Sequence, residues 1–310
     1  MSDPSAPAPM PTPEDRWERT FPAPVVDGAA VAAWLAPWPE IVGRPWRVLA
    51  GGLRAVTVLV GDDRVLRVAL TAEEDVAKHA AVLRAMARSV RTPAVVAVAP
   101  PALLLEHVAH APLRDTEADG RLVGRAAARI HATSFPRSGF LDASLSVPAP
   151  FETALDGLLD WAQACLDGHA GRRLGPRADR VEAAWERAER RLRAACARNA
   201  LVHGDFKPTN VRRAEGGDDV VVFDAEFAWA GPALMDLGQM LRWGCSDAFV
   251  EGLVDGYLDA GGTLEPRWRE TAALLDLFHL VGLLDHETPM PVRDADVLAR
   301  VDATLAAARG

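Results

Sequence analysis

The stretch LVHGDFKPTNV, residues 201–211, and the stretch VVVFDAE, residues 220–226, decide how this 310-residue sequence is interpreted. Asp205 precedes Asn210 by five positions, and Asp224 follows an apolar run that is typical of a β-strand. Metal-assisted phosphoryl transfer needs one carboxylate that accepts or orients the hydroxyl proton of the acceptor. It also needs an amide oxygen and a second carboxylate that hold Mg²⁺ against nucleotide phosphates. The spacing therefore predicts a phosphoryl-transfer site.

Two further side chains of these stretches can contribute to the same chemistry. Lys207 lies between Asp205 and Asn210, where its ammonium could neutralise charge on the transferring phosphoryl group. Glu226 lies two residues past Asp224 and has two interpretations: it assists the metal, or it is a loop acid that is exposed or pairs with a nearby arginine. Hard oxygen ligands suit Mg²⁺, which takes only one or two side chains from a protein.

The segment 201–211 resembles the Brenner motif of the aminoglycoside phosphotransferase and choline kinase-like family, whose fold is similar to that of protein kinases. FDAEFAWAGPALMDLGQMLRW, residues 223–243, resembles the metal-binding strand of that family and the helix after it. The resemblance implies that Asp205 is the catalytic base and that Asn210 and Asp224 are metal ligands. It also implies that Asp236 supports the catalytic loop.

The first part of the chain alternates between β-branched runs and turns. Gly51-Gly52, the Gly61-Asp62-Asp63 turn and Pro100-Pro101 separate these runs, which therefore read as antiparallel strands. One longer segment between them has apolar residues at helical spacing. The expected strands are 47–50, 55–60, 64–69, 95–98 and 102–106, and the expected helices are 27–35 and 72–88.

Beyond residue 113 the pattern is mostly helical, with short strands expected at 201–202 and 220–223. We expect an α+β, two-lobed protein kinase-like fold with a small five-stranded antiparallel N-lobe, one main N-lobe helix and a larger, mostly helical C-lobe. The expected boundaries are a disordered Pro/Ala-rich tail over 1–24, a nucleotide-binding lobe over 25–108 and a catalytic and substrate lobe over 109–310.

The nucleotide side of the site is predicted from three stretches. In residues 49–60, Gly51 and Gly52 occupy the place of the family's phosphate-covering hairpin and would let backbone N–H groups approach the phosphates. Arg67 stands where kinases usually place a lysine that binds the α- and β-phosphates, and arginine can bind phosphate bidentately. The inter-lobe linker would bind adenine through the main chain of Glu106, His107 and Val108.

The carboxylate partner of Arg67 is a departure from the family pattern. His79 replaces the family's glutamate at that position. Asp75, one helical turn earlier, either substitutes for this glutamate or is a solvated acid stabilised by the helix dipole. Phosphate positioning depends on whether Asp75 or Glu74 reaches Arg67.

Composition excludes several classes of protein. A net charge of −9 argues against a nucleic-acid surface, and the 49% hydrophobic fraction is ordinary for a globular chain. The most apolar stretch is interrupted by prolines and is too short to span a bilayer. The N-terminus has no signal-peptide pattern, and the three cysteines lack metal-ligand spacing, which indicates reduced thiols in the cytoplasm.

These patterns predict a Mg²⁺-dependent small-molecule kinase that moves the γ-phosphate of ATP (or GTP) to a hydroxyl group. The alternative is a catalytically impaired kinase-like protein that binds nucleotide or a partner for regulation, and Arg67 and His79 motivate it. The acceptor and the oligomeric state stay open. Acids over 247–259 either line an acceptor pocket for a cationic substrate or form the solvated face of a surface helix.

Overall fold

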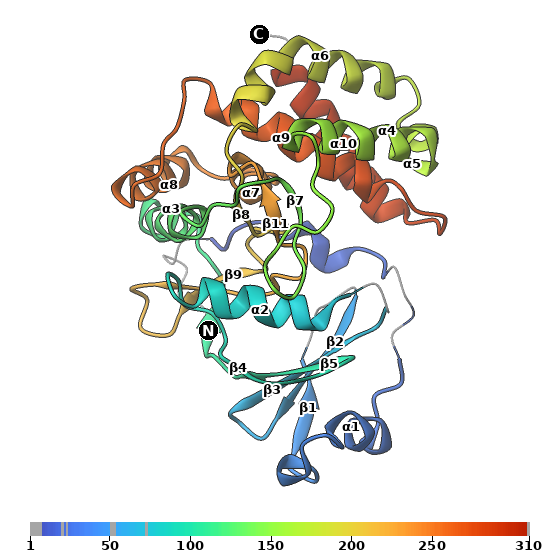
Figure 1. Cartoon of the computed structure of the whole chain (residues 1–310), viewed down its shortest axis with the longest axis vertical. Coiled ribbons are helices and arrows are strands. Elements are labelled where there is room, and N and C mark those ends of the chain that lie inside the picture. The colour runs from blue at the N-terminus through green and yellow to red at the C-terminus, as the bar shows by residue number, and fades with distance from the viewer. Residues whose placement is uncertain (1–7, 20–21, 23, 50–53, 72–73, 309–310) are drawn as a thin grey trace.

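The computed structural model describes residues 8–19, 22, 24–49, 54–71 and 74–308. They form a smaller N-lobe and a larger helical C-lobe (Figure 1). The predicted two-lobed α+β fold is confirmed, as is the five-stranded antiparallel sheet of the N-lobe. Its strand order is β1-β2-β3-β5-β4, with bounds β1 (Trp46–Val48), β2 (Ala55–Val60), β3 (Arg64–Ala69), β4 (Val95–Ala99) and β5 (Ala102–Glu106).

Helices cover both faces of this sheet. Because successive strand residues point to opposite faces, Leu103 and Leu105 pack with α2 (Val76–Met86), whereas Leu104 packs with α1 (Gly28–Leu35). Asp27 caps α1, as predicted, by accepting a hydrogen bond from the N–H of Ala30. Figure 1 shows α2 on the side of the sheet that faces the C-lobe. The 3-10 helix η2 (Pro39–Ile41) connects α1 to β1.

Helix α2 begins later than the apolar pattern predicted. The expected start was residue 72, but α2 begins at Val76 because Asp75 caps it by accepting a hydrogen bond from the N–H of Lys78. Glu74 therefore lies before the helix rather than within its first turn. This placement decides which acid reaches Arg67.

The C-lobe is built from helices around two small sheets. The sheets have strand orders β10-β9-β6 and β7-β11-β8, and several of these short strands were not predicted. The helices are α3 (Glu117–His131), α4 (Ala154–Asp167), α5 (His169–Leu174), α6 (Arg177–Ala195), α7 (Leu234–Met240), α8 (Asp247–Asp259), α9 (Trp268–Leu283) and α10 (Pro291–Ala307). The strands are β6 (His110–Ala111), β7 (Gly139–Phe140), β8 (Ala200–Val202), β9 (Val211–Ala214), β10 (Val220–Val222) and β11 (Trp229–Gly231).

Helices α3 and α8 approach one another closely through glycines. A Cβ atom added at Gly124 would overlap the carbonyl oxygen of Leu253, and one at Gly252 would overlap that of Glu117. Backbone therefore packs against backbone where these helices cross. The pairing holds Tyr257 of α8 beside His131 at the end of α3.

Residues 8–19 differ from the disordered tail that composition predicted. This segment, called the N-terminal strap below, contains the 3-10 helix η1 (Pro13–Arg16) and lies against the C-lobe. The N–H of Met10 donates to the carbonyl of Leu113, and the indole of Trp17 donates to Asp296 at 2.9 Å. Trp17 also packs edge-on against Trp243. This proline- and alanine-containing segment is therefore ordered by its contacts with the C-lobe.

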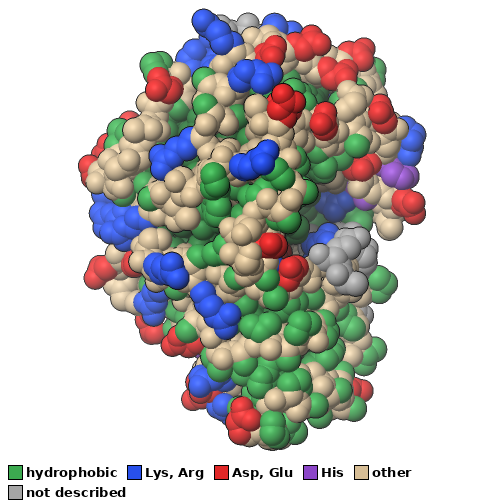
Figure 2. Space-filling model, viewed as in Figure 1, with side chains coloured by type: hydrophobic (Ala, Val, Ile, Leu, Met, Phe, Trp, Pro, Cys, Tyr) green, Lys and Arg blue, Asp and Glu red, His purple; other side chains and the backbone are tan. Residues whose placement is uncertain are grey.

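Surface charge is mixed on the face drawn in Figure 2, where basic and acidic side chains are interspersed over the C-lobe. Among the described residues, no helix is both long enough and apolar enough to cross a membrane. Cys165, Cys196 and Cys245 are free thiols.

Candidate active site

The catalytic loop, residues 203–210, joins β8 to β9 and brings Asp205, Lys207 and Asn210 together. The ammonium Nζ of Lys207 lies 3.0 Å from Asp205 Oδ2, and Asn210 Nδ2 donates to the same oxygen at 2.7 Å. Burial raises the pKa of Asp205, but the charge and hydrogen bond of Lys207, with smaller effects of His279 and His203, together outweigh burial and hold this pKa below its ordinary value. Asp205 is therefore an ionised hydrogen-bond acceptor at neutral pH.

Two buried side chains of α7 support the backbone of this loop. The carboxylate of Asp236 accepts hydrogen bonds from the N–H groups of His203 and Gly204 at 2.8 and 3.0 Å. Gln239 accepts from the N–H of Phe206 and donates to the carbonyl of Gly204, each at 2.8 Å. Because these backbone groups are buried, their hydrogen bonds restrict the loop to one conformation.

Asp236 is itself positioned from the α3–α8 pair. His131 Nε2 lies 3.0 Å from the Asp236 carboxylate, and His131 Nδ1 lies 3.1 Å from the hydroxyl of Tyr257. His203 joins the catalytic loop to the next one, since its Nε2 lies 2.7 Å from the carbonyl of Phe223. Helix packing in the C-lobe is thus connected to the reactive loop by hydrogen bonds.

Asp224 follows β10 on a loop that is hydrogen-bonded to Asn210. The N–H of Phe223 donates to the carbonyl of Asn210 at 2.8 Å, which holds the two loops together. Asp224 has a φ of +52°, a left-handed conformation that costs a non-glycine residue roughly 1–2 kcal/mol. The surrounding contacts therefore hold this side chain in an unfavourable backbone geometry, as is common at functional sites.

Arg67 of β3 contacts three carboxylates from two segments. Its Nε donates to Asp224 at 3.0 Å, its Nη2 donates to Glu226 at 2.7 Å, and its Nη1 pairs with Glu74. The side chain of Arg67 is only 5% exposed. Of the two acids that could reach Arg67, Glu74 supplies the carboxylate, whereas Asp75 caps the N-terminus of α2. This agrees with the second interpretation of Asp75, an acid at the start of the helix.

A group of potential metal ligands lies next to Arg67. One ligand atom each from His79, Asp224 and Glu226 fall within 4.8 Å of one another. The second oxygen of Glu226 and both ring nitrogens of the fully buried His79 have no hydrogen-bond partner among the described residues. Lys78, also missed from the sequence, donates to the carbonyl of Glu226 at 2.9 Å and holds this loop against α2.

The donor set suits a hard divalent cation. Asp224 keeps one carboxylate oxygen that forms no hydrogen bond with the described residues, and its side chain is 42% exposed. Asn210 uses its amide nitrogen toward Asp205, which leaves its amide oxygen available. An amide oxygen and a carboxylate on adjoining loops are the ligands that Mg²⁺ accepts.

The residues expected to contact the nucleotide differ in whether the structure describes them and in whether their N–H groups are free to bind a ligand. Gly51 and Gly52 lie outside the described residues. In the linker after β5, the N–H groups of Glu106 and His107 already donate to the carbonyls of Ala94 and Asp63. Val108 N–H forms no hydrogen bond with the described residues, so it is the linker donor that a base could use.

The acids of α8 lie on the surface. Asp255 and Asp259, which are 53% and 64% exposed, pair with Arg121 of α3, and Asp247 is 92% exposed. Their side chains form the solvated face of a helix, one of the two interpretations of this pattern.

The strap supplies a residue that the sequence did not indicate. Glu14 is buried, its Oε1 accepts a hydrogen bond from the indole of Trp243 at 2.6 Å, and its Oε2 has no partner. Burial lowers the pKa of Lys207, but the charges of Asp205 and Glu14 and the hydrogen bond to Asp205 together raise it above its ordinary value, so the ammonium stays charged. No sequence signal could have indicated this, because the contact joins residues 229 positions apart.

A two-lobed kinase-like fold is typical of phosphotransferases when it carries an Asp-x-x-x-x-Asn loop whose backbone is held by buried hydrogen bonds. Residues 45–274, well over half of the chain, match the model of the phosphotransferase enzyme family (APH). The chain belongs to that family. No curated protein was matched by sequence.

Solved structures with similar folds include proteins named as small-molecule kinases. A putative fructosamine-3-kinase from Thermobifida fusca is 20% identical with a TM-score of 0.68, covering 92% of this chain and 100% of that one. A choline/ethanolamine kinase family protein from Mesorhizobium loti is 20% identical with a TM-score of 0.65, covering 91% and 98%. A streptomycin–ATP–APH(2")-IIa ternary complex is 15% identical with a TM-score of 0.64, covering 92% and 97%.

Proposed function

We propose that this protein transfers the γ-phosphate of ATP (or GTP) to a hydroxyl group of a small molecule. The observation that carries the proposal is the position of Asp205, ionised and held by Lys207 and Asn210 on a loop whose backbone is bonded to Asp236 and Gln239. Such rigidity matters because catalysis of phosphoryl transfer is mostly positioning and electrostatic stabilisation. A member of the phosphotransferase enzyme family uses a nucleotide co-substrate.

The charged residues of the site have separate roles in the proposed reaction. Asp205 accepts or orients the proton of the acceptor hydroxyl. Lys207 is released from Asp205 as the acceptor binds and neutralises charge on the phosphoryl group. Arg67 contacts the nucleotide phosphates, and Glu74 holds its guanidinium in place.

Asn210 and Asp224 would hold Mg²⁺, with Glu226 close enough to assist. When bound, the ion would neutralise charge on the nucleotide phosphates. Gly51 and Gly52 would cover these phosphates, and the main chain of 106–108 would bind the base through the Val108 N–H rather than the occupied N–H groups of Glu106 and His107.

The alternative, a catalytically impaired kinase-like protein, rests on Arg67 and His79. Glu74 weakens it, because this acid pairs with Arg67 and supplies the carboxylate that His79 does not. The comparisons offer no support for that alternative. We place the proposed activity in the cytoplasm.

The test is phosphate transfer to a panel of hydroxylated amines, amino alcohols, sugars and hydroxy acids. ADP or GDP release would be followed with Mg²⁺ and with each nucleotide, and the phosphorylated product identified by mass spectrometry. The proposal expects a covalently phosphorylated acceptor in at least one reaction. Nucleotide binding without transfer to any class would instead support the impaired protein.

A further inference from the structure

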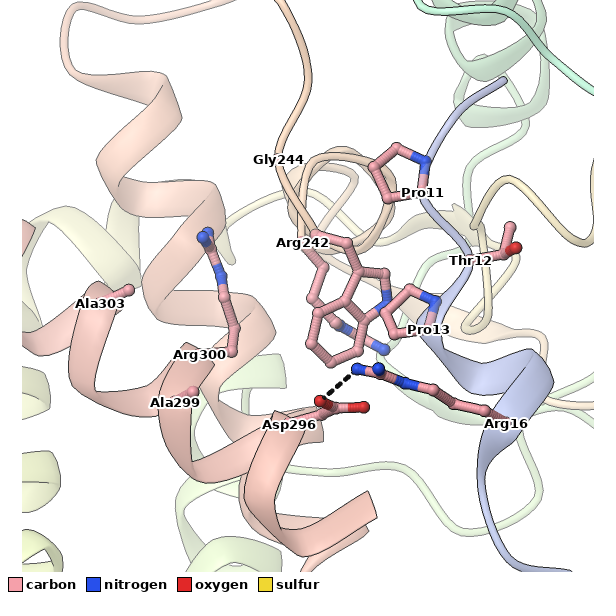
Figure 3. Close-up of a pocket in the computed structure, with 11 residues that line it drawn as sticks. Pro11, Thr12, Pro13, Arg16, Arg242, Gly244, Asp296, Ala299, Arg300 and Ala303 are labelled. Atoms are coloured by element: carbon pink, nitrogen blue, oxygen red, sulfur yellow. Dashed lines mark hydrogen bonds and ion pairs between the residues drawn. The ribbon is translucent and has the colours of Figure 1, made fainter. Parts of the chain in front are cut away.

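A cavity of about 620 Å³ lies between the N-terminal strap, the residues after α7 and helix α10 (Figure 3). Pro11, Pro13 and Trp243 contribute apolar surface. In Figure 3, Ala299 and Arg300 of α10 form one side and the strap forms the other. The strap thus completes a cavity that the C-lobe alone would leave open.

The charges that line this cavity are not balanced. Arg16 pairs with Asp296 at 2.7 Å, and Arg242 pairs with the buried Asp276 at 2.6 Å. Arg300 forms no hydrogen bond or ion pair with any of the described residues, and its Nε is buried without a partner. The lining therefore carries one uncompensated positive charge.

An unpaired, partly buried guanidinium is costly, because burial removes water without supplying another acceptor. Burial is the main reason that the pKa of Arg300 is lowered; the charge of Asp276 opposes it, and the charges of Arg242 and Arg269 have smaller lowering effects. An arginine in such a place is suited to a carboxylate or phosphate, whose oxygens match its donors.

The cavity adjoins the proposed phosphoryl-transfer site through two residues. Arg242 follows α7, the helix that supplies Asp236 and Gln239 to the catalytic loop, and the charge of Asp205 acts on it. Trp243 donates its indole hydrogen bond to Glu14, whose charge acts on Lys207. Arg242 and Trp243 therefore connect the lining of the cavity to the catalytic loop.

We propose that this cavity binds the acceptor and that Arg300 recognises an anionic group, a carboxylate or a phosphate, on that molecule. This inference rests on the proposed function. Arg300 is then a specificity-determining residue, and the apolar surface of Pro11, Pro13 and Trp243 contacts the carbon skeleton. The preferred substrates are hydroxylated acids rather than polycationic sugars.

The binding step can be measured without turnover. In the full-length ¹⁵N-labelled protein, the indole signal of Trp243 is assigned from its loss in Trp243→Phe. Inorganic phosphate and acetate are then titrated at constant ionic strength against chloride. We expect a saturable shift of the Trp243 signal and a roughly tenfold or greater loss of affinity in Arg300→Gln, the usual effect of removing a charge-assisted hydrogen bond.

Arg269→Gln is the matched control. It removes an equal charge from the same region, but Arg269 is 55% exposed and does not line the cavity. Its affinity for the anions should stay within about threefold of wild type, because exposed charges act weakly through water. Since Arg300 has no partner to lose, Arg300→Gln should fold, and anions should raise the unfolding midpoint of the wild type more than that of this variant.

Equal affinity in wild type and Arg300→Gln, or no saturable shift with either anion, would overturn the anion site. The acceptor assignment is tested by turnover with 4-hydroxybutyrate and its carboxamide. A preference for the carboxylate that Arg300→Gln abolishes is expected; preference for the amide would refute it. If no acceptor is phosphorylated, the proposed function and the acceptor assignment fail together, whereas the titration still decides the anion site.

Discussion

Arg67 of the N-lobe donates a hydrogen bond to Asp224 of the C-lobe, with Nε and Oδ1 3.0 Å apart. The same guanidinium contacts Glu74 and Glu226, so one buried cation links both lobes through three carboxylates. In the proposed reaction, nucleotide phosphates and a metal would compete for these groups. The ion cluster therefore keeps the nucleotide site assembled before any ligand binds.

Arg67→Gln should destabilise the protein strongly. It leaves three clustered carboxylates without their cation, and breaking a buried ion pair from one side costs roughly 3–5 kcal/mol. Arg67→Lys keeps the charge but cannot bind three carboxylates in a fork, so it should lose less. Urea unfolding measures both. A loss below about 1 kcal/mol for Arg67→Gln would mean that the cluster is solvated rather than buried.

The stability of the metal-free protein should depend on pH through Glu226. Burial, opposed by the charge of Arg67 and assisted by the charges of Asp224 and Glu74, raises the pKa of Glu226 to about 8. A carboxyl with a higher pKa in the folded state binds more protons when folded. Its contribution to stability is therefore complete below its ordinary pKa and is lost as the pH rises toward about 8.

Glu226→Gln removes this titration. The free energy of unfolding of Glu226→Gln relative to wild type should rise between about pH 5 and pH 8, as urea unfolding at several pH values would reveal. A constant difference across this range would show that Glu226 has the same proton affinity in the folded and unfolded chains.

Asp205→Asn should lower turnover by about 10²–10⁴-fold, the usual contribution of a general base, while nucleotide affinity changes little. The amide keeps the shape of the side chain but loses the charge that accepts the proton. Asp218→Asn, in the exposed turn between β9 and β10, is the control and should retain full turnover. Turnover close to wild type in Asp205→Asn would remove the proposed base.

Gly124→Ala should lower stability by about 1–3 kcal/mol because its methyl group would overlap the backbone of Leu253 and push α3 from α8. Gly28→Ala is a matched control, since a Cβ there meets no atom within 4 Å. Its effect should be neutral or slightly stabilising. Equal midpoints for the two variants in thermal unfolding would contradict the close helix packing.

The N-lobe strands and the Asp205–Asn210 spacing could be predicted because they depend on local patterns. Alternation of β-branched residues between Gly- and Pro-containing turns defines the strands, and the catalytic loop needs its residues at fixed positions. Glu74 and Asp75 show the limit of this approach. Because the helix was expected to begin near residue 72 and begins at Val76, the sequence left open which of the two acids pairs with Arg67.

The N-terminal strap could not be predicted from its own composition. Its order comes from single tertiary contacts, such as Glu14 with Trp243 and Trp17 with Asp296, which join residues far apart in the sequence. The cavity that it completes, including the unpaired Arg300, depends on the same contacts. Side-chain pairing across such distances leaves no periodic signal in a single sequence.

Thermal unfolding with ATP and with GTP, each with and without Mg²⁺, tests most directly whether Asp224 and Asn210 form a Mg²⁺-dependent nucleotide site. A nucleotide at about 100 times its dissociation constant stabilises a folded protein by roughly 2.7 kcal/mol. We predict a rise in the unfolding midpoint with at least one nucleotide that requires Mg²⁺ and is absent in Asp224→Asn. No rise with either nucleotide, or a rise of equal size without Mg²⁺, would contradict the account.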